Sequence, residues 1–166
     1  DNILRFMRHQ IMVDLDIFRK DIVNSTLNLM EKWSQSAENL IMGTAMQESH
    51  FTHRKQLGGG PALGLFQMEP ATHDDIWNNY ICHRNNLNEI MKQFTKDALP
   101  DQLENDDRYA TAMCRVHYMR VPESLPFEND VVGMAAYWKS YYNTPSGAGT
   151  MNEFIENYER MTSDGP

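Results

Sequence analysis

Apolar residues recur at helical spacing through almost the whole of this chain, and that periodicity most restricts what the chain can fold into. Between residues 14 and 33, polar residues separate apolar ones that lie three, four or seven positions apart, namely Leu15, Phe18, Ile22, Leu29 and Trp33. This spacing is typical of an amphipathic helix with one face in a core. The same periodicity continues through the later segments. It predicts an all-α domain, with an α+β fold as the outer limit.

Capping residues divide the remaining chain into further helices, because Ser, Thr, Asp and Asn side chains satisfy the free backbone N–H groups of a first turn. The predicted caps are Ser36, a residue within 72–75, Asp106 or Asp107, Asn129 or Asp130, and Thr150 with Glu153 in capping-box spacing. A glycine-rich segment at residues 56–70, QLGGGPALGLFQMEP, is predicted to be a loop. We find no repeat and no linker. A single domain over 1–166 is therefore expected, with 1–34 as an N-terminal helical extension.

The composition excludes several classes of protein. The formal net charge of −8 leaves no basic surplus for binding phosphates, so we expect no nucleic-acid partner. No apolar run approaches the roughly 20 residues that span a bilayer, and residues 1–10 lack the apolar centre of a secretory signal. Since the chain starts at Asp1, we expect it to be trimmed or excised from a longer one. The two cysteines, Cys82 and Cys114, are expected to be buried thiols of a reducing compartment, with a disulfide between them as the alternative.

One carboxylate stands where its surroundings favour the neutral form. The segment IMGTAMQESHF at 41–51 begins as the buried face of a helix and then reaches Glu48 in the predicted last turn. Burial against apolar side chains raises the pKa of a carboxyl group, and the negative end of a helix dipole acts in the same direction. A carboxyl group with a raised pKa can act as a general acid near neutral pH. Glu48 is therefore the first candidate for a catalytic residue.

Two blocks of sequence resemble the lytic transglycosylases and goose-type lysozymes. Residues 48–51, Glu-Ser-His-Phe, match the Glu-Ser-x-Phe helix end of that group. Residues 64–72, GLFQMEPAT, match its Gly-Leu-Met-Gln and Pro-Ala-Thr motifs, with Phe66 in place of Met. A weaker match joins Tyr142 and Asn143 to an Ala-Tyr-Asn-Ala-Gly segment, with Tyr137 as the rival position. The resemblance covers about residues 36–160, and YWKSYYNT is similar in style to phage-encoded members.

The resemblance implies a lysozyme-like helical domain with a glycine-rich cleft loop and an enzyme that needs no cofactor. It implies cleavage of the MurNAc-β-1,4-GlcNAc bond of peptidoglycan with Glu48 as the catalytic residue, leaving 1,6-anhydro-MurNAc ends. The implied substrate-binding residues are Ser49, Gln67, Phe66, Tyr142, Asn143 and Tyr137. Each has a structural alternative: Ser49 could bond its own helix, Gln67 could face water, and the tyrosines could be core residues.

Other functions remain open. A goose-type lysozyme would hydrolyse the same bond and would need a second carboxylate. The candidates are Glu69, Asp74, Asp75, Asp106 and Asp107, but the aspartates suit helix caps and first turns, so we predict no dedicated second carboxylate. A module that binds peptidoglycan without turnover, or a structural part of a virion, is the alternative outside enzymes. A helical regulator that binds protein partners is a third.

Metal and esterase chemistry are not indicated. The histidines are scattered, the segment with His50 and His53 leaves the predicted helix, and no His-Glu-x-x-His or Gly-x-Ser-x-Gly pattern occurs. We therefore expect no metal. The expected partner is the glycan strand, bound by a monomer acting on the bacterial cell wall in the periplasm. A phage endolysin, a virion-associated domain and a bacterial remodelling enzyme would share this site.

Overall fold

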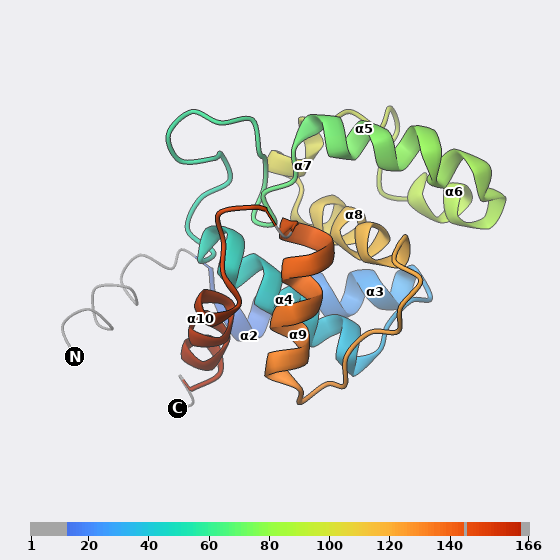
Figure 1. The fold of residues 1–166 in the computed structure, drawn as a ribbon. Helices are drawn as coiled ribbons and strands as arrows, with labels where there is room; N and C mark the ends of the chain where they lie inside the picture. Colours follow the sequence, from blue (N-terminus) through green and yellow to red (C-terminus); the bar gives the residue numbers. More distant parts are fainter. Residues whose placement is uncertain (1–12, 145, 164–166) are drawn as a thin grey trace.

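The computed structural model describes residues 13–144 and 146–163, and this part of the chain is all-α with no sheet (Figure 1). Two isolated β-bridges pair Lys55 with Leu63 and Leu63 with Met68. Two elements, η1 and η3, are π-helical and η2 is a 3-10 helix. The elements are α2 (Leu15–Ile17), η1 (Phe18–Asn24), α3 (Ser25–Leu29), α4 (Gln35–Ser49), α5 (Pro70–Asn79), η2 (Ile81–His83), α6 (Asn85–Met91), α7 (Gln102–Asn105), α8 (Asp107–Met119), α9 (Val131–Trp138), η3 (Lys139–Asn143) and α10 (Met151–Ser163).

Helix α4 lies at the centre of the fold and is buried on all sides. Every residue from Leu40 to Met46 is buried, which a helix with a solvent-facing stripe would not allow. Helices α8, α9 and α10 and the π-helix η1 pack around it (Figure 1). The contact with α10 is close at Gly43, where a Cβ atom would lie 2.7 Å from Cζ of Phe154. A glycine at this position allows the two helices to approach.

The first helical stretch differs from its predicted face. Phe18 is buried, but Leu29 and Trp33 are exposed, and Val23, Leu27 and Met30 fill the core instead. The reason is the π-helical turn η1, which adds one residue to a turn, so that the buried position after Phe18 is Val23 and not Ile22. These side chains belong to the same core as α4 and α8, so residues 18–30, predicted as part of an extension, help to form the domain core. The first twelve residues of that extension lie outside the described residues.

Helix caps agree with the sequence at two sites and differ at two others. Asp106 accepts a hydrogen bond from the Tyr109 amide, and Asp130 accepts one from the Gly133 amide, which confirms both predicted caps. The predicted cap at Ser36 is wrong, because Ser34 is extended and its Oγ accepts from the Ala37 amide. The cap predicted within 72–75 is wrong as well. Helix α5 begins earlier, at Pro70, whose ring suits a first helical position.

The remaining local predictions have mixed outcomes. Oγ1 of Thr150 accepts a hydrogen bond from the Glu153 amide, which is one half of a capping box. The other half is replaced by a bond between the two side chains. Cys114 is buried, but Cys82 is exposed, so the expectation of two buried thiols is wrong for Cys82. It lies in the short helix η2, where only Ile81 faces the core.

A buried carboxylate joins the first helical stretch to α4. Glu38, in the first turn of α4, is buried and pairs with the guanidinium of Arg19 at 2.8 Å. Its two oxygens also accept hydrogen bonds from Asn24, Trp33 and Gln35. Burial alone would raise the pKa of Glu38, but the four donors together lower it. The ionised form is therefore the one that the fold stabilises.

We expect Glu38→Gln to lower the free energy of unfolding at neutral pH by about 1–3 kcal/mol, because at least one buried donor loses its charged acceptor. Since the pKa of Glu38 is lowered by folding, this loss should be full above the unfolded-state pKa near 4.5 and should shrink as the pH falls below it. Urea unfolding at about pH 7 and about pH 3.5 measures both values. Glu156→Gln, at an exposed position of α10, is the control. Equal losses at both pH values would contradict the prediction.

Candidate active site

The C-terminal end of α4 presents Glu48 to a pocket. The helix ends at Ser49 because His50 adopts a left-handed backbone conformation with φ of 52°, and its amide donates to the carbonyl of Met46. This αL residue is a common way to stop a helix. Glu48 therefore lies in the last turn of a buried helix, next to the point where the chain turns away. Its side chain is half-buried.

The carboxyl group of Glu48 is protonatable near neutral pH. Burial raises its pKa to about 7, although a hydrogen bond from Trp138 acts to lower it. The bond runs from Nε1 of the indole to Oε2 of Glu48 at 3.0 Å. Burial raises the pKa of Cys114, Tyr118 and Tyr142, and the nearby charge of Glu48 acts in the same direction. A carboxyl group in this setting can give up a proton and take one back.

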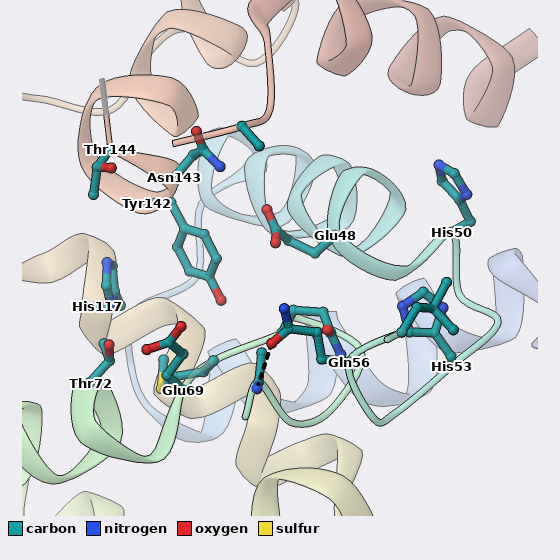
Figure 2. A pocket seen from close by; sticks show the side chains of 15 residues that line it. Glu48, His50, His53, Gln56, Glu69, Thr72, His117, Tyr142, Asn143 and Thr144 are labelled. Atoms are coloured by element: carbon teal, nitrogen blue, oxygen red, sulfur yellow. Dashed lines mark hydrogen bonds between the residues drawn. The ribbon is translucent and has the colours of Figure 1, made fainter. Parts of the chain in front are cut away.

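The pocket has a volume of about 770 Å³ and is lined by residues far apart in sequence. Glu48 comes from α4, Gln56 and Gln67 from the connection to α5, His117 from α8, and Tyr142 from η3. Figure 2 shows the Glu48 carboxyl directed from α4 towards Tyr142 and Asn143. No lysine or arginine of the described residues lines the pocket. The lining therefore offers hydroxyl, amide, imidazole and carboxyl groups to a ligand.

The connection from α4 to α5 forms one wall and depends on two anchors. An ion pair joins Arg54 to Asp107 of α8 at 2.8 Å. Gly64 has φ of 79°, and a Cβ atom there would lie 2.4 Å from the carbonyl oxygen of Leu103. Only glycine fits this combination of backbone conformation and close approach. These contacts hold the segment before Gln67 against the helices.

Four of the seven predicted site residues line the pocket: Glu48, Gln67, Tyr142 and Asn143. Gln67 has φ of 48°, and its Nε2 donates to the carbonyl of Gly64 at 2.9 Å. This bond fixes the amide group and leaves its oxygen as the free acceptor. Asn143 accepts a hydrogen bond from Nζ of Lys139 at 2.8 Å, so its Oδ1 already has a partner.

Tyr142 is fixed by contacts at both its hydroxyl and its ring. The hydroxyl donates to the backbone carbonyl of Phe66 at 2.5 Å, and the ring packs against His117 with centroids 4.7 Å apart. Burial raises the pKa of Tyr142 well above its usual value. The residue therefore joins η3 to the wall formed by the connection and offers the pocket its aromatic surface.

The other three predicted residues, Ser49, Phe66 and Tyr137, do not line the pocket. Ser49 is buried, and its Oγ donates to the Ala45 carbonyl and accepts from the Phe51 amide, so its hydroxyl is used within the helix end. Phe66 is buried in the core, and its backbone carbonyl accepts the hydrogen bond of the Tyr142 hydroxyl. Tyr137 is buried, and its hydroxyl donates to the Glu123 carbonyl. These three residues therefore have structural roles, Ser49 in the helix end and the two aromatic residues in the core.

Sequence reasoning missed several residues of the pocket. It also missed Trp138, which binds Glu48 but does not line the pocket, because an indole in an apolar helix has the same sequence pattern as any core residue. His50, His53 and His117 line the pocket and were considered only as metal ligands. Burial lowers the pKa of all three, so their neutral forms are favoured. Glu69 was considered as a second carboxylate and does line the pocket, as an exposed side chain without a capping bond to α5.

His117 has one ring nitrogen without a partner. Nε2 lies 3.1 Å from the carbonyl oxygen of Tyr141, and a carbonyl only accepts, so this nitrogen carries the proton. In the neutral ring Nδ1 is then an acceptor, and it is buried without a hydrogen-bond partner among the described residues. Figure 2 shows the ring beside Tyr142, on the side away from Glu48.

No protein-family model, no curated protein and no solved structure matches this chain. Among the described residues, no three His, Cys, Asp or Glu side chains are grouped so that they could hold a metal ion. No helix within 13–144 and 146–163 has the length and apolar character needed to cross a bilayer. Function is therefore inferred from the residues of the pocket.

We expect Glu48→Gln to stabilise the fold at neutral pH. The pKa of Glu48 is about 7 in the folded protein and near 4.5 in the unfolded chain. Unfolding therefore releases a proton between these values, and the free energy of unfolding of the parent falls as the pH rises through them. Glutamine has no such dependence, so the advantage of the variant should grow over this window to roughly 3 kcal/mol, because one pKa unit is about 1.36 kcal/mol.

Urea unfolding of the parent and Glu48→Gln at about pH 4 and about pH 8 measures this difference. Glu89→Gln, at an exposed position of α6, controls for the loss of one negative charge. A stability difference that does not change with pH would show that Glu48 titrates normally in the folded protein.

Proposed function

We propose that this chain is a peptidoglycan lytic transglycosylase, with Glu48 as its single acid and base. The observation that carries the proposal is the Glu48 carboxyl group, which has a pKa of about 7 and lies in the wall of a pocket of about 770 Å³. Glu48 and Gln67, one from each of the two sequence blocks that resemble the transglycosylases, both line this pocket. A general acid works best when its pKa is close to the working pH.

The proposed reaction uses Glu48 twice. The neutral carboxyl first donates its proton to the bridging oxygen between MurNAc and GlcNAc, while the bond from that oxygen to the anomeric carbon breaks. The carboxylate then accepts the proton of the MurNAc 6-hydroxyl, whose oxygen bonds to the anomeric carbon. The product is a 1,6-anhydro ring, and no water is consumed. A carboxyl group with a pKa of about 7 is suited to both steps, since neither protonation state is strongly favoured at neutral pH.

The rest of the pocket suits a glycan strand. The free amide oxygen of Gln67 could accept a hydrogen bond from an N-acetyl N–H group, and the ring of Tyr142 offers a surface for a sugar. The absence of lysine and arginine from the described lining does not favour a phosphate-bearing ligand. The expected site of action is the bacterial cell wall, reached from the periplasm as a phage endolysin, a virion component or a cellular enzyme.

A goose-type lysozyme is the second candidate, and Glu69 favours it. This carboxylate lines the same pocket as Glu48, and Figure 2 shows it on the opposite side from Glu48, near the hydroxyl end of Tyr142. A second carboxylate could activate a water molecule, which would then attack the anomeric carbon in place of the 6-hydroxyl. The other candidate carboxylates, Asp74, Asp75, Asp106 and Asp107, do not line the pocket.

Mass spectrometry of fragments released from purified peptidoglycan tests the proposal. The parent is expected to release muropeptides that end in 1,6-anhydro-MurNAc. Glu48→Gln should reduce the rate by about 10²–10⁴-fold, which is the usual contribution of general acid–base catalysis. Glu69→Gln should leave the anhydro product in place, and Glu89→Gln serves as the control for charge.

Other products would identify the other candidates. Fragments one water heavier, lost in both Glu48→Gln and Glu69→Gln, would indicate a lysozyme. Retention on peptidoglycan by the parent and by Glu48→Gln, without release of any fragment, would indicate a binding module. Equal release by the parent and by Glu48→Gln would remove Glu48 from the chemistry.

A further inference from the structure

The hydrogen bond between Trp138 and Glu48 distinguishes the two oxygens of the carboxyl group. The indole Nε1–H lies 3.0 Å from Oε2, and an indole nitrogen can only donate a hydrogen bond. A proton on Oε2 would reduce the ability of that oxygen to accept this bond, whereas the unprotonated oxygen of a carboxylic acid is a good acceptor. The neutral carboxyl group is therefore expected to carry its proton on Oε1.

The indole is held so firmly that it can impose this choice. Trp138 is fully buried, and its ring stacks on Phe154 of α10 with centroids 5.5 Å apart. On another side, a Cβ atom at Gly149 would lie 2.5 Å from Cη2 of the indole. Nζ of Lys139 donates to the carbonyls of Gly147 and Gly149 and holds that segment in place. The N–H group therefore has a fixed direction, set by packing from α10 and the segment before it.

The titratable groups that are buried around Glu48 are uncharged in their favoured states. Cys114 and Tyr118 face it from α8 and Tyr142 from η3, and burial raises the pKa of each. Burial lowers the pKa values of the three histidines that line the pocket, and the exposed carboxylate of Glu69 also lies in its wall. Against this background, the Trp138 bond is the contact that opposes the effect of burial on the pKa of Glu48.

We propose that Trp138 is a positioning residue that reserves Oε1 of Glu48 as the oxygen that carries and transfers the proton. That Oε1 transfers this proton to and from a glycan rests on the proposed function. In the first step the Oε1–H bond breaks and an O–H bond forms on the departing GlcNAc hydroxyl. In the second step the proton of the 6-hydroxyl returns to Oε1. The indole N–H meanwhile stabilises the negative charge on the carboxylate through Oε2.

Trp138→Phe removes the N–H group and keeps an aromatic ring against Phe154. The matched control is Trp33→Phe, because Nε1 of Trp33 donates to Oε1 of Glu38 at 3.1 Å, which is an indole–carboxylate bond far along α4 from Glu48. Carbon-13 NMR of labelled glutamate side chains, assigned with Glu48→Gln, measures the pKa of Glu48 without substrate. We expect the pKa of Glu48 to rise by about one unit in Trp138→Phe, because its carboxylate loses a charge-assisted hydrogen bond, and to stay unchanged in Trp33→Phe.

The pH profile of peptidoglycan cleavage tests the positioning role. In Trp138→Phe the fall in kcat at alkaline pH should move to higher pH, and the kcat plateau should drop at least several-fold with KM little changed, because the proton is no longer confined to one oxygen. A general loss of packing would lower activity without moving the profile. If Trp138→Phe does not fold, benzothienylalanine at position 138 keeps the shape of the indole and removes the N–H.

Two results would overturn the proposal: an unchanged pKa of Glu48 in a folded variant that lacks the N–H, or a raised pKa with an unchanged kcat plateau. The two proposals can be told apart. If the parent does not cleave peptidoglycan but the pKa of Glu48 rises in Trp138→Phe, the assignment of the proton to Oε1 is supported and the transglycosylase function is not.

Discussion

The burial of α4 on all sides is the constraint on which the rest of the structure depends. A helix surrounded by four neighbours has no solvent-facing stripe, so each polar group on it must find a partner or lose its charge. Its two glutamates show both outcomes. Glu38, in the first turn, has four donors from the first helical stretch and its surroundings, and its pKa is lowered. Glu48, in the last turn, has the indole of Trp138 and a pKa of about 7.

The contrast between these glutamates separates a structural role from a chemical one. Glu38 is ionised, fully bonded and closed off, which suits a group that joins two parts of the fold. Glu48 is only partly bonded and lies beside a pocket, so it can exchange a proton with a ligand. Both carboxylates are on one helix, but the ends of that helix differ in which neighbours carry donors. The position of the donors determines which carboxylate can react.

Sequence patterns predicted those features that depend on near neighbours in the chain. The all-α class and the caps at Asp106 and Asp130 follow from local spacing, and they are confirmed. Gln67 and Tyr142 were assigned by motif and lie with Glu48 on the pocket. The lysozyme-like fold and the transglycosylase activity stay predictions.

The failures have a common physical cause, which is that tertiary contacts decide between local alternatives. The π-helical turn at η1 changes the buried face of the first helical stretch, and the spacing of Phe18 and Ile22 does not predict this turn. The indole of Trp138 could have been a plain core group, and only the approach of α9 to α4 gives its N–H a carboxylate. Glu69 is similar, because its place on the pocket depends on where α5 begins.

Gly43 links the apolar core to the acidity of the site. It has no side chain, yet its lack of a Cβ sets how closely α10 approaches α4, through Phe154. Phe154 in turn supports the indole that faces Glu48. A larger residue at position 43 would displace this stack and alter the indole–carboxylate geometry without touching a polar atom. Exchanges of small and large residues in the core could thus change the pKa of this carboxyl group, while every residue of the pocket stayed the same.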